Sequence, residues 1–210
     1  MSEIFFVSDL HFSHNAILKF TNRGNLWKNV YEMNDALIER WNSVVKKRDF
    51  VYVLGDFAWD RVGWLLNVLN GKKFMIEGNH DSESRKYMKS FSGWSQIKEI
   101  KVSGRKFVLC HFPLRSWNGS NIGATHFFGH VHGRMKTFNL SFDVGIDVPE
   151  NKHAPVHVDE MIRRIKLRET EMKANGRIRE EEINGKKHLI YYQDDCEFLA
   201  PGKARNKDIK

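Results

Sequence analysis

The sequence predicts an α/β or α+β fold in which two β-sheets pack as a two-layer sandwich with helices on the outside. Three short apolar runs, at residues 4–7, 50–54 and 74–76, each end in polar side chains, and helical patterns lie between them. This order is typical of parallel strands joined by crossover helices. Further strand-like runs occur within residues 97–144, as expected for a second sheet packed on the first.

The first strand is predicted at residues 4–7, a fully apolar run that leads directly to Asp9 and His11. A helix of about four turns is expected at residues 33–45, because apolar side chains recur there at helical spacing. The pair Asp9 and His11 is therefore expected in the loop at the end of a buried strand.

The next two strands repeat this arrangement. Residues 50–54 run into Asp56, a helix is predicted at residues 64–69, and residues 74–76 run into the polar segment 78–81. In a parallel sheet the carboxyl ends of the strands lie at one edge, which is where such sheets bind their ligands. We therefore expect these polar segments to meet.

The middle of the chain predicts a hairpin, with strands at residues 97–102 and 106–110. Its second strand runs into His111. Residues 127–128 lead in the same way into Gly129-His130-Val131-His132. The histidines of this second sheet are thus also expected at strand ends.

The C-terminal third predicts a charged amphipathic helix from Val158 and a hairpin turning at Asn184-Gly185. We predict a catalytic domain at residues 1–160, an extension of it at residues 161–198 and a disordered basic tail at residues 199–210. The helix and hairpin could complete the core, cover the site or form a dimer contact, and the oligomeric state is not predicted.

The composition limits the class of protein. A chain of 210 residues with 41% apolar content can bury one sizeable core, and its net charge of +8 favours anionic partners without choosing among them. Two cysteines are too few for a disulfide scaffold, which indicates a reducing compartment and, by default, the cytoplasm. We expect no membrane span and no signal peptide.

Five polar motifs follow the strand-like runs: Asp9-x-His11, Gly55-Asp56, Gly78-Asn79-His80-Asp81, His111 and Gly129-His130-x-His132. Carboxylates hold hard cations and imidazoles add neutral ligands, so this set suits metal-dependent phosphate chemistry. One such motif alone would be weak evidence. Five in this order, each after a strand, predict a metal site.

These motifs resemble those of the calcineurin-like metallophosphoesterase superfamily, in particular its small bacterial and phage-type branch, over residues 4 to about 160. The resemblance implies a β-sandwich flanked by helices and a binuclear metal centre. It implies that one metal is held by Asp9, His11 and His132, the other by Asn79, His111 and His130, with Asp56 bridging them and His80 left as the family's non-ligand histidine.

Two divalent cations that share a carboxylate and a hydroxide generate a nucleophile and clamp the phosphoryl oxygens during in-line displacement. Asp56 would supply the shared negative charge. His80 would act as general acid toward the leaving group, a contribution of about 10²–10⁴-fold. By resemblance the expected metal is Mn²⁺, while ligand type does not discriminate against Fe, Zn, Ni or Co.

Three further residues are predicted substrate contacts. His14 follows His11 by three residues, and its alternative is a solvated helix start. Arg115 could pair with phosphate and Trp117 could stack on a base or sugar, against ordinary loop packing. Asp81 could orient His80 or cap the next helix.

The leading hypothesis is a phosphodiesterase or phosphomonoesterase acting on a small phosphorylated substrate. Protein phosphatase activity is less favoured, because Asp81 stands where that branch has Glu and Arg61 lies five residues after Asp56. The alternative is a basic nucleic-acid-binding protein or a nuclease with the same metal site. A steep salt dependence of DNA or RNA binding would favour that alternative.

Overall fold

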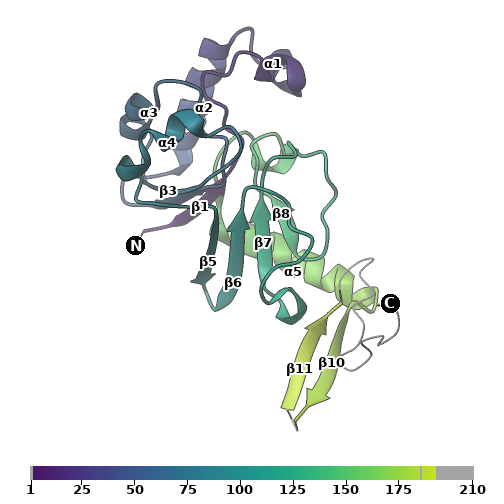
Figure 1. Ribbon diagram of the computed structural model, residues 1–210. Coiled ribbons are helices and arrows are strands. Elements are labelled where there is room, and N and C mark those ends of the chain that lie inside the picture. The colour runs from purple at the N-terminus through teal and green to yellow at the C-terminus, as the bar shows by residue number, and fades with distance from the viewer. Residues whose placement is uncertain (1, 185, 193–210) are drawn as a thin grey trace, which may run out of the picture.

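The computed structural model describes residues 2–184 and 186–192 and contains two main sheets and a separate hairpin (Figure 1). The sheets have the strand orders β4-β3-β2-β1-β9 and β5-β6-β7-β8, and the hairpin is β10-β11. This is the predicted combination of two sheets, flanking helices and a C-terminal hairpin, so the predicted fold class is confirmed.

The first sheet has four parallel strands and one short antiparallel strand at its edge. In the order of the sheet these are β4 (Gly93–Ser95), β3 (Lys72–Ile76), β2 (Phe50–Val53), β1 (Ile4–Val7) and β9 (Val156–His157). The predicted crossover helices are present as α2 (Val30–Val44) and α3 (Val62–Val68). Shorter helical segments are α1 (Ile17–Phe20), α4 (Ser82–Arg85), η1 (Asn22–Asn25), η2 (Met88–Ser90), η3 (Ser120–Ile122) and η4 (Pro149–Asn151).

Both faces of this sheet are buried. Phe5 and Val7 belong to the core beneath α2, together with Trp41. Phe6 points the other way and packs its ring on Phe127 of the second sheet, with centroids 4.7 Å apart. Alternate residues of a strand face opposite sides, so a strand buried on both faces requires an unbroken apolar run.

The second sheet joins β5 (Ile97–Val102) and β6 (Arg105–Cys110) as the predicted antiparallel hairpin. Its turn residues Ser103 and Gly104 both have positive φ, at 50° and 79°, the conformation that favours tight hairpins. Strands β7 (Thr125–Phe128) and β8 (Ser141–Asp143) then extend the sheet in parallel with β6. The carboxyl ends of β6 and β7 therefore lie at one edge of this sheet.

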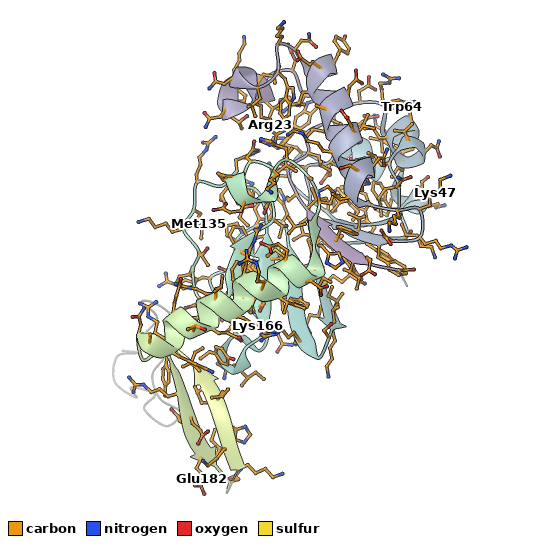
Figure 2. The ribbon with its side chains drawn as sticks, turned by 180° about the vertical axis from the view of Figure 1, so that it is seen from behind. Arg23, Lys47, Trp64, Met135, Lys166 and Glu182 are labelled. Atoms are coloured by element: carbon orange, nitrogen blue, oxygen red, sulfur yellow. The ribbon has the colours of Figure 1, made fainter. Side chains whose placement is uncertain are left out.

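Helix α5 (Val158–Ala174) lies along the second sheet, behind it in Figure 1 and in front of it in Figure 2. Its Met161 and Ile165 share a core with Phe107 and Phe127. The predicted division at residue 160 thus falls inside one helix. Within residues 2–184 and 186–192, none of the helices combines the length and apolar character needed to cross a bilayer.

The predicted C-terminal hairpin is formed by β10 (Ile178–Ile183) and β11 (Lys186–Tyr191), and it projects beyond the end of α5 (Figure 1). The Tyr191 hydroxyl donates to Glu169 of α5 over 3.2 Å, which ties the base of the hairpin to the helix. The last residues of the predicted extension and the predicted tail at 199–210 lie outside the described residues.

Candidate metal centre

The five predicted motifs meet where strands of the two sheets end. His11 Nε2 and His111 Nε2 lie 3.4 Å and 3.6 Å from the Asp56 carboxylate. Further contacts join the remaining members: Asp9 with His132 at 4.0 Å, and Asn79 with His111 at 3.0 Å and with His130 at 3.1 Å. The structure thus brings all seven predicted ligands together.

Two groups within the described residues offer ligand atoms close enough to hold an ion. One is Asp9, His11 and His132, and the other is Asp9, Asp56 and His111. Asp9 occurs in both groups, whereas the resemblance assigned it to one metal. The two groups therefore have the Asp9 carboxylate in common.

The backbone at this site is held in an unusual conformation. Asp9, His11, Asp56, His130 and His132 all have φ between 51° and 71°, the left-handed region that non-glycine residues rarely adopt. Each such residue costs on the order of 1–3 kcal/mol and persists only where the surroundings enforce it. Such clustering is typical of sites whose geometry serves a function.

Two glycines are required because the chains approach each other closely. A Cβ at Gly129 would lie 1.8 Å from Ser8 Oγ, and one at Gly78 would lie 2.5 Å from Asp56 Oδ1. Neither of them has a positive φ, so it is the space that a side chain would occupy, and not the backbone conformation, that requires glycine there. Their missing side chains leave room for the carboxylates.

The histidine hydrogen bonds show which ring nitrogens face the site. His111 Nδ1 lies 2.7 Å from the Leu54 carbonyl, which can only accept, so Nδ1 carries the proton. In the neutral ring Nε2 is then an acceptor, and it points at Asn79 Oδ1, 3.0 Å away. Two acceptors facing each other repel, and a cation between them would relieve the repulsion. The residues present therefore fit a metal ion.

His11 and Asp9 lead to the same conclusion. Both ring nitrogens of the buried His11 lack a hydrogen-bond partner, and burial, followed by the nearby Arg23, lowers its pKa to about 2. Burial also raises the pKa of Asp9 to about 7. A neutral imidazole and a carboxylate short of positive charge are the ligands that a divalent cation requires.

A fully buried arginine supports one side of this centre. Arg23 donates to the carbonyls of Asp9 and Leu10, over 2.5 Å and 3.0 Å, and makes a bidentate pair with Asp147 at 2.8 Å and 2.6 Å. Asp147 in turn accepts from His132 Nδ1 at 2.6 Å. This relay leaves His132 Nε2 facing Asp9.

The hydrogen bonds that join Arg23, Asp147 and His132 also explain the shifted pKa values of Asp147 and His132. Burial alone would raise the pKa of Asp147, but its hydrogen bonds with Arg23 and His132 hold that pKa well below the usual range. Burial would lower the pKa of His132, but the Asp147 hydrogen bond and the Asp9 charge raise it. Neither Arg23 nor Asp147 was predicted, since neither belongs to a motif at a strand end.

Asp81 has a different role from the two that its position predicted. Its carboxylate accepts from the backbone amides of Asp56, Phe57 and Gly78, at 2.7–2.9 Å. It makes no side-chain cap to the next helix. Asp81 therefore holds the loops after β2 and β3 together, and this fixes Asp56 beside Asn79.

His80 lies beside the centre with an exposed ring. Its backbone amide donates to Asp56 Oδ1 over 2.9 Å, and its ring centroid lies 5.8 Å from that of His11. Neither ligand group identified among the described residues includes it. This position, close to the ligands but separate from them, is the one expected for a proton donor.

The predicted substrate contacts differ in their surroundings. His14 is half-buried and stacks on Trp59 at 3.8 Å, next to His11 and His80. Trp59 also lies 4.8 Å from His80, and nothing in the sequence pattern singled it out. The pair therefore forms an aromatic wall beside the centre.

Arg115 is exposed on the loop after β6. Trp117, on the same loop, is only 7% exposed, donates to the Ala124 carbonyl and packs with Val108. Its indole belongs to the packing of that loop and offers no face on which a substrate base could stack.

The fold and the site define the class of protein: a metal-binding hydrolase built on a two-layer sandwich. The family model for calcineurin-like phosphoesterases matches residues 2–173, and the chain belongs to that family. An uncharacterized protein of Methanocaldococcus jannaschii is 35% identical over 159 residues, covering 69% of this chain and 84% of that protein.

Two further similarities are more distant. The gene 66 protein of Mycobacterium phage L5 is 26% identical over 171 residues, covering 64% of this chain and 80% of that protein. The crystal structure of a protein of unknown function from Aquifex aeolicus superposes with a TM-score of 0.61 at 21% identity. It covers 78% of this chain and 99% of that one, and shows that the fold is shared.

Proposed function

We propose that this protein is a phosphodiesterase that depends on two divalent cations, with His80 as the general acid. The observation that carries the proposal is the site itself, in which the buried Asp56 carboxylate lies 3.4 Å from His11 Nε2 and 3.6 Å from His111 Nε2. Divalent cations would stabilise such a cluster of ligand atoms. The cations would be held by Asp9, His11, Asp56, Asn79, His111, His130 and His132.

Two divalent cations held by these residues would lower the pKa of a bound water molecule and neutralise the oxygens of a phosphoryl group. We propose Mn²⁺ as the activating ion, with Fe, Zn, Ni or Co as other occupants. Asp56 lies between the two histidines that point at it and would keep the positive charges close together. The small number of cysteines favours a reducing compartment such as the cytoplasm.

His80 supplies the proton in this proposal. A phosphodiester releases an alkoxide, a poor leaving group that needs protonation as the bond breaks. The backbone of His80 is fixed to Asp56, and its ring lies close to that of His11, so it would be near a phosphoryl group bound by the cations. Its exposure allows it to recover a proton from solvent after each turnover.

A protein phosphatase role has less support. Arg61, the arginine that follows Asp56, stacks its guanidinium 4.2 Å from the centre of the Trp64 ring. It is engaged on the outer face of α3, where both of these side chains lie, and would have to leave this contact to bind phosphate.

The test is hydrolysis of bis-p-nitrophenyl phosphate by protein that has been stripped with chelator and reloaded with Mn²⁺. We expect Asp56→Asn to lose hydrolysis. His80→Ala should lose about 10²–10⁴-fold on alkyl phosphodiesters and far less on aryl diesters, whose leaving group needs no proton. His188→Ala, on the exposed hairpin, is the matched control. Unchanged hydrolysis by Asp56→Asn, with at most one metal per chain, would overturn the proposal.

A further inference from the structure

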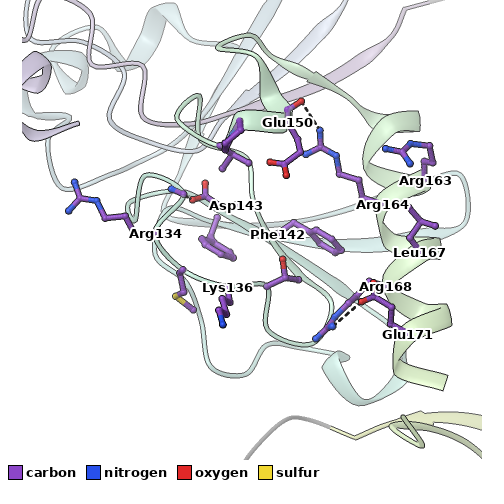
Figure 3. Close-up of a pocket in the computed structure, with 16 residues that line it drawn as sticks. Arg134, Lys136, Phe142, Asp143, Glu150, Arg163, Arg164, Leu167, Arg168 and Glu171 are labelled. Carbon is purple, nitrogen blue, oxygen red and sulfur yellow. Dashed lines mark hydrogen bonds and ion pairs between the residues drawn. The ribbon is translucent and has the colours of Figure 1, made fainter. Parts of the chain in front are cut away.

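Two adjoining hollows lie beside His132 and the loop that follows it, on the side of the metal centre supported by Arg23 and Asp147. The smaller, of about 440 Å³, is lined by the metal-ligand candidate His132 and by Asp147. The larger, of about 550 Å³, lies between α5 and the loop after His132 (Figure 3). They share Gly133, Arg134 and Pro149, so the two hollows adjoin each other between His132 and α5.

The larger hollow is rich in positive charge. Five basic and three acidic side chains line it. One of the acids, Asp143, turns inward and accepts from the amides of Gly133 and Gly145, at 2.8 Å and 2.7 Å. The cations of this hollow are Arg134, Lys136, Arg163, Arg164 and Arg168.

Two of these arginines are anchored in place. Arg164 donates to the Asn151 side chain at 2.7 Å and to the Glu150 carbonyl, and Arg168 donates to the Asn139 carbonyl at 3.1 Å. Carboxylates also hold these guanidinium groups at fixed points along α5, since Arg164 donates to Glu160 at 2.8 Å and Arg168 to Glu171 at 3.1 Å. Lys136 on the facing loop is exposed, and so is Arg163 on α5, which pairs with Glu160 at 2.7 Å and 2.8 Å. Fixed and exposed cations thus occupy both sides of the hollow.

The hollow is also apolar. Phe142 lies between the loop and α5 in Figure 3, with Phe128 as a further lining residue. Met135 and Leu167 line the same hollow and are 42% and 55% exposed. Exposed apolar side chains among cations fit a ligand that carries both phosphates and flat apolar rings.

We propose that these two hollows bind single-stranded nucleic acid, with the strand passing from the metal centre beside His132, along Arg134, into the hollow against α5. The phosphates would meet the cations and a base would pack against Leu167 and Met135. A duplex keeps its bases stacked inside, so it would leave these apolar side chains without contact. The inference rests on the proposed function and names the substrate class.

The test is binding of a fluorescein-labelled ten-nucleotide oligothymidylate to the full chain, followed by fluorescence anisotropy in EDTA so that no hydrolysis occurs. Lys136→Gln combined with Arg163→Gln should raise Kd at least about tenfold and reduce the slope of log Kd against log salt by about 1.4. Leu167→Ser should raise Kd without changing that slope.

The matched control is Lys47→Gln combined with Arg48→Gln, which removes the same charge from an exposed segment. Lys47 lies far from Met135 in Figure 2. This control should change Kd less than about twofold. An equal loss in both double variants, or equal affinity for a duplex of the same length, would overturn the inference.

The two proposals fail separately. If the wild-type chain hydrolyses bis-p-nitrophenyl phosphate with Mn²⁺ and does not bind the oligonucleotide, the strand path is wrong and the phosphodiesterase stands. If it binds the oligonucleotide through Lys136 and Arg163 but shows no metal-dependent hydrolysis, the phosphodiesterase is wrong and the binding path stands.

Discussion

The two halves of the metal centre are built differently. The half formed by Asp9, His11 and His132 is backed by the fully buried Arg23, which reaches His132 through Asp147. In the half formed by Asn79, His111 and His130, the asparagine and His130 are exposed, and the Leu54 carbonyl holds His111 from behind. We call these the first half-site and the second half-site.

The difference indicates how each half would hold an ion. In the first half-site the ligands are fixed before a metal arrives, so little conformational freedom is lost on binding. In the second half-site two of three ligands are exposed side chains that must be ordered. We therefore expect the first half-site to bind more tightly and the second to exchange its ion more readily.

The largest expected effect is on stability. Arg23→Met keeps the volume of the side chain but leaves Asp147 buried without its partner, which should cost about 3–5 kcal/mol in the free energy of unfolding. Urea denaturation of the metal-free protein measures this. Arg48→Met, at an exposed position, should stay within about 0.5 kcal/mol. An equally small effect for both would show that the Arg23 network does not support the first half-site.

A smaller effect is expected on metal affinity. Asp147→Asn keeps the shape of the side chain but weakens the hydrogen bond that orients His132, which should reduce affinity at the first half-site about 10–100-fold. Isothermal titration with Mn²⁺ measures both sites in one experiment. An equal loss of Mn²⁺ affinity at the second half-site would contradict the proposed difference between the two half-sites.

Metal binding should also depend on pH. Burial raises the pKa of Asp9 to about 7 in the metal-free chain, so below pH 7 a proton competes with the cation for this carboxylate. Affinity at the first half-site should fall about tenfold per pH unit below 7 from this group alone. The metal-free chain should lose stability as pH rises from about 4 to 7, because the folded state favours the protonated Asp9. Calorimetry in buffers of different ionisation enthalpy should show proton release on binding, and its absence at pH 6 would contradict this.

The smallest expected effect is the change in the free energy of unfolding caused by a substitution in the exposed second half-site. His130→Gln should change the free energy of unfolding by no more than about 0.5 kcal/mol, since the side chain is exposed. It should still remove the second metal. Thermal melting with and without Mn²⁺ separates the two effects, and a large loss of stability in the metal-free chain would show that the second half-site is as embedded as the first.

The strand-end motifs could be predicted because each strand and the polar residues after it are recognisable from a short stretch of sequence. Apolar runs before Asp9 and Asp56 identify buried strands, and parallel strands bring their carboxyl ends to one edge. The Ser103-Gly104 turn likewise needs positive φ at both positions, which limits the choice of residues.

The supporting network could not be predicted, because it depends on contacts between distant segments. Arg23 and Asp147 are 124 positions apart, and a single arginine in a short 3₁₀ helix carries no pattern. Asp81 follows a motif, yet its partners are backbone amides that any residue provides. The direction of the Trp117 indole is decided by the packing of its loop and not by its neighbours in sequence.

The central claim is that two unequal half-sites form one catalytic centre. Its most direct test is titration of the chelated wild-type chain with Mn²⁺, followed by electron paramagnetic resonance and by hydrolysis of bis-p-nitrophenyl phosphate in the same samples. We predict two ions per chain, the first bound about 10–100-fold more tightly, with hydrolysis and the spin-coupled signal both appearing only with the second. Saturation at one ion, or full hydrolysis after the first, would contradict the claim.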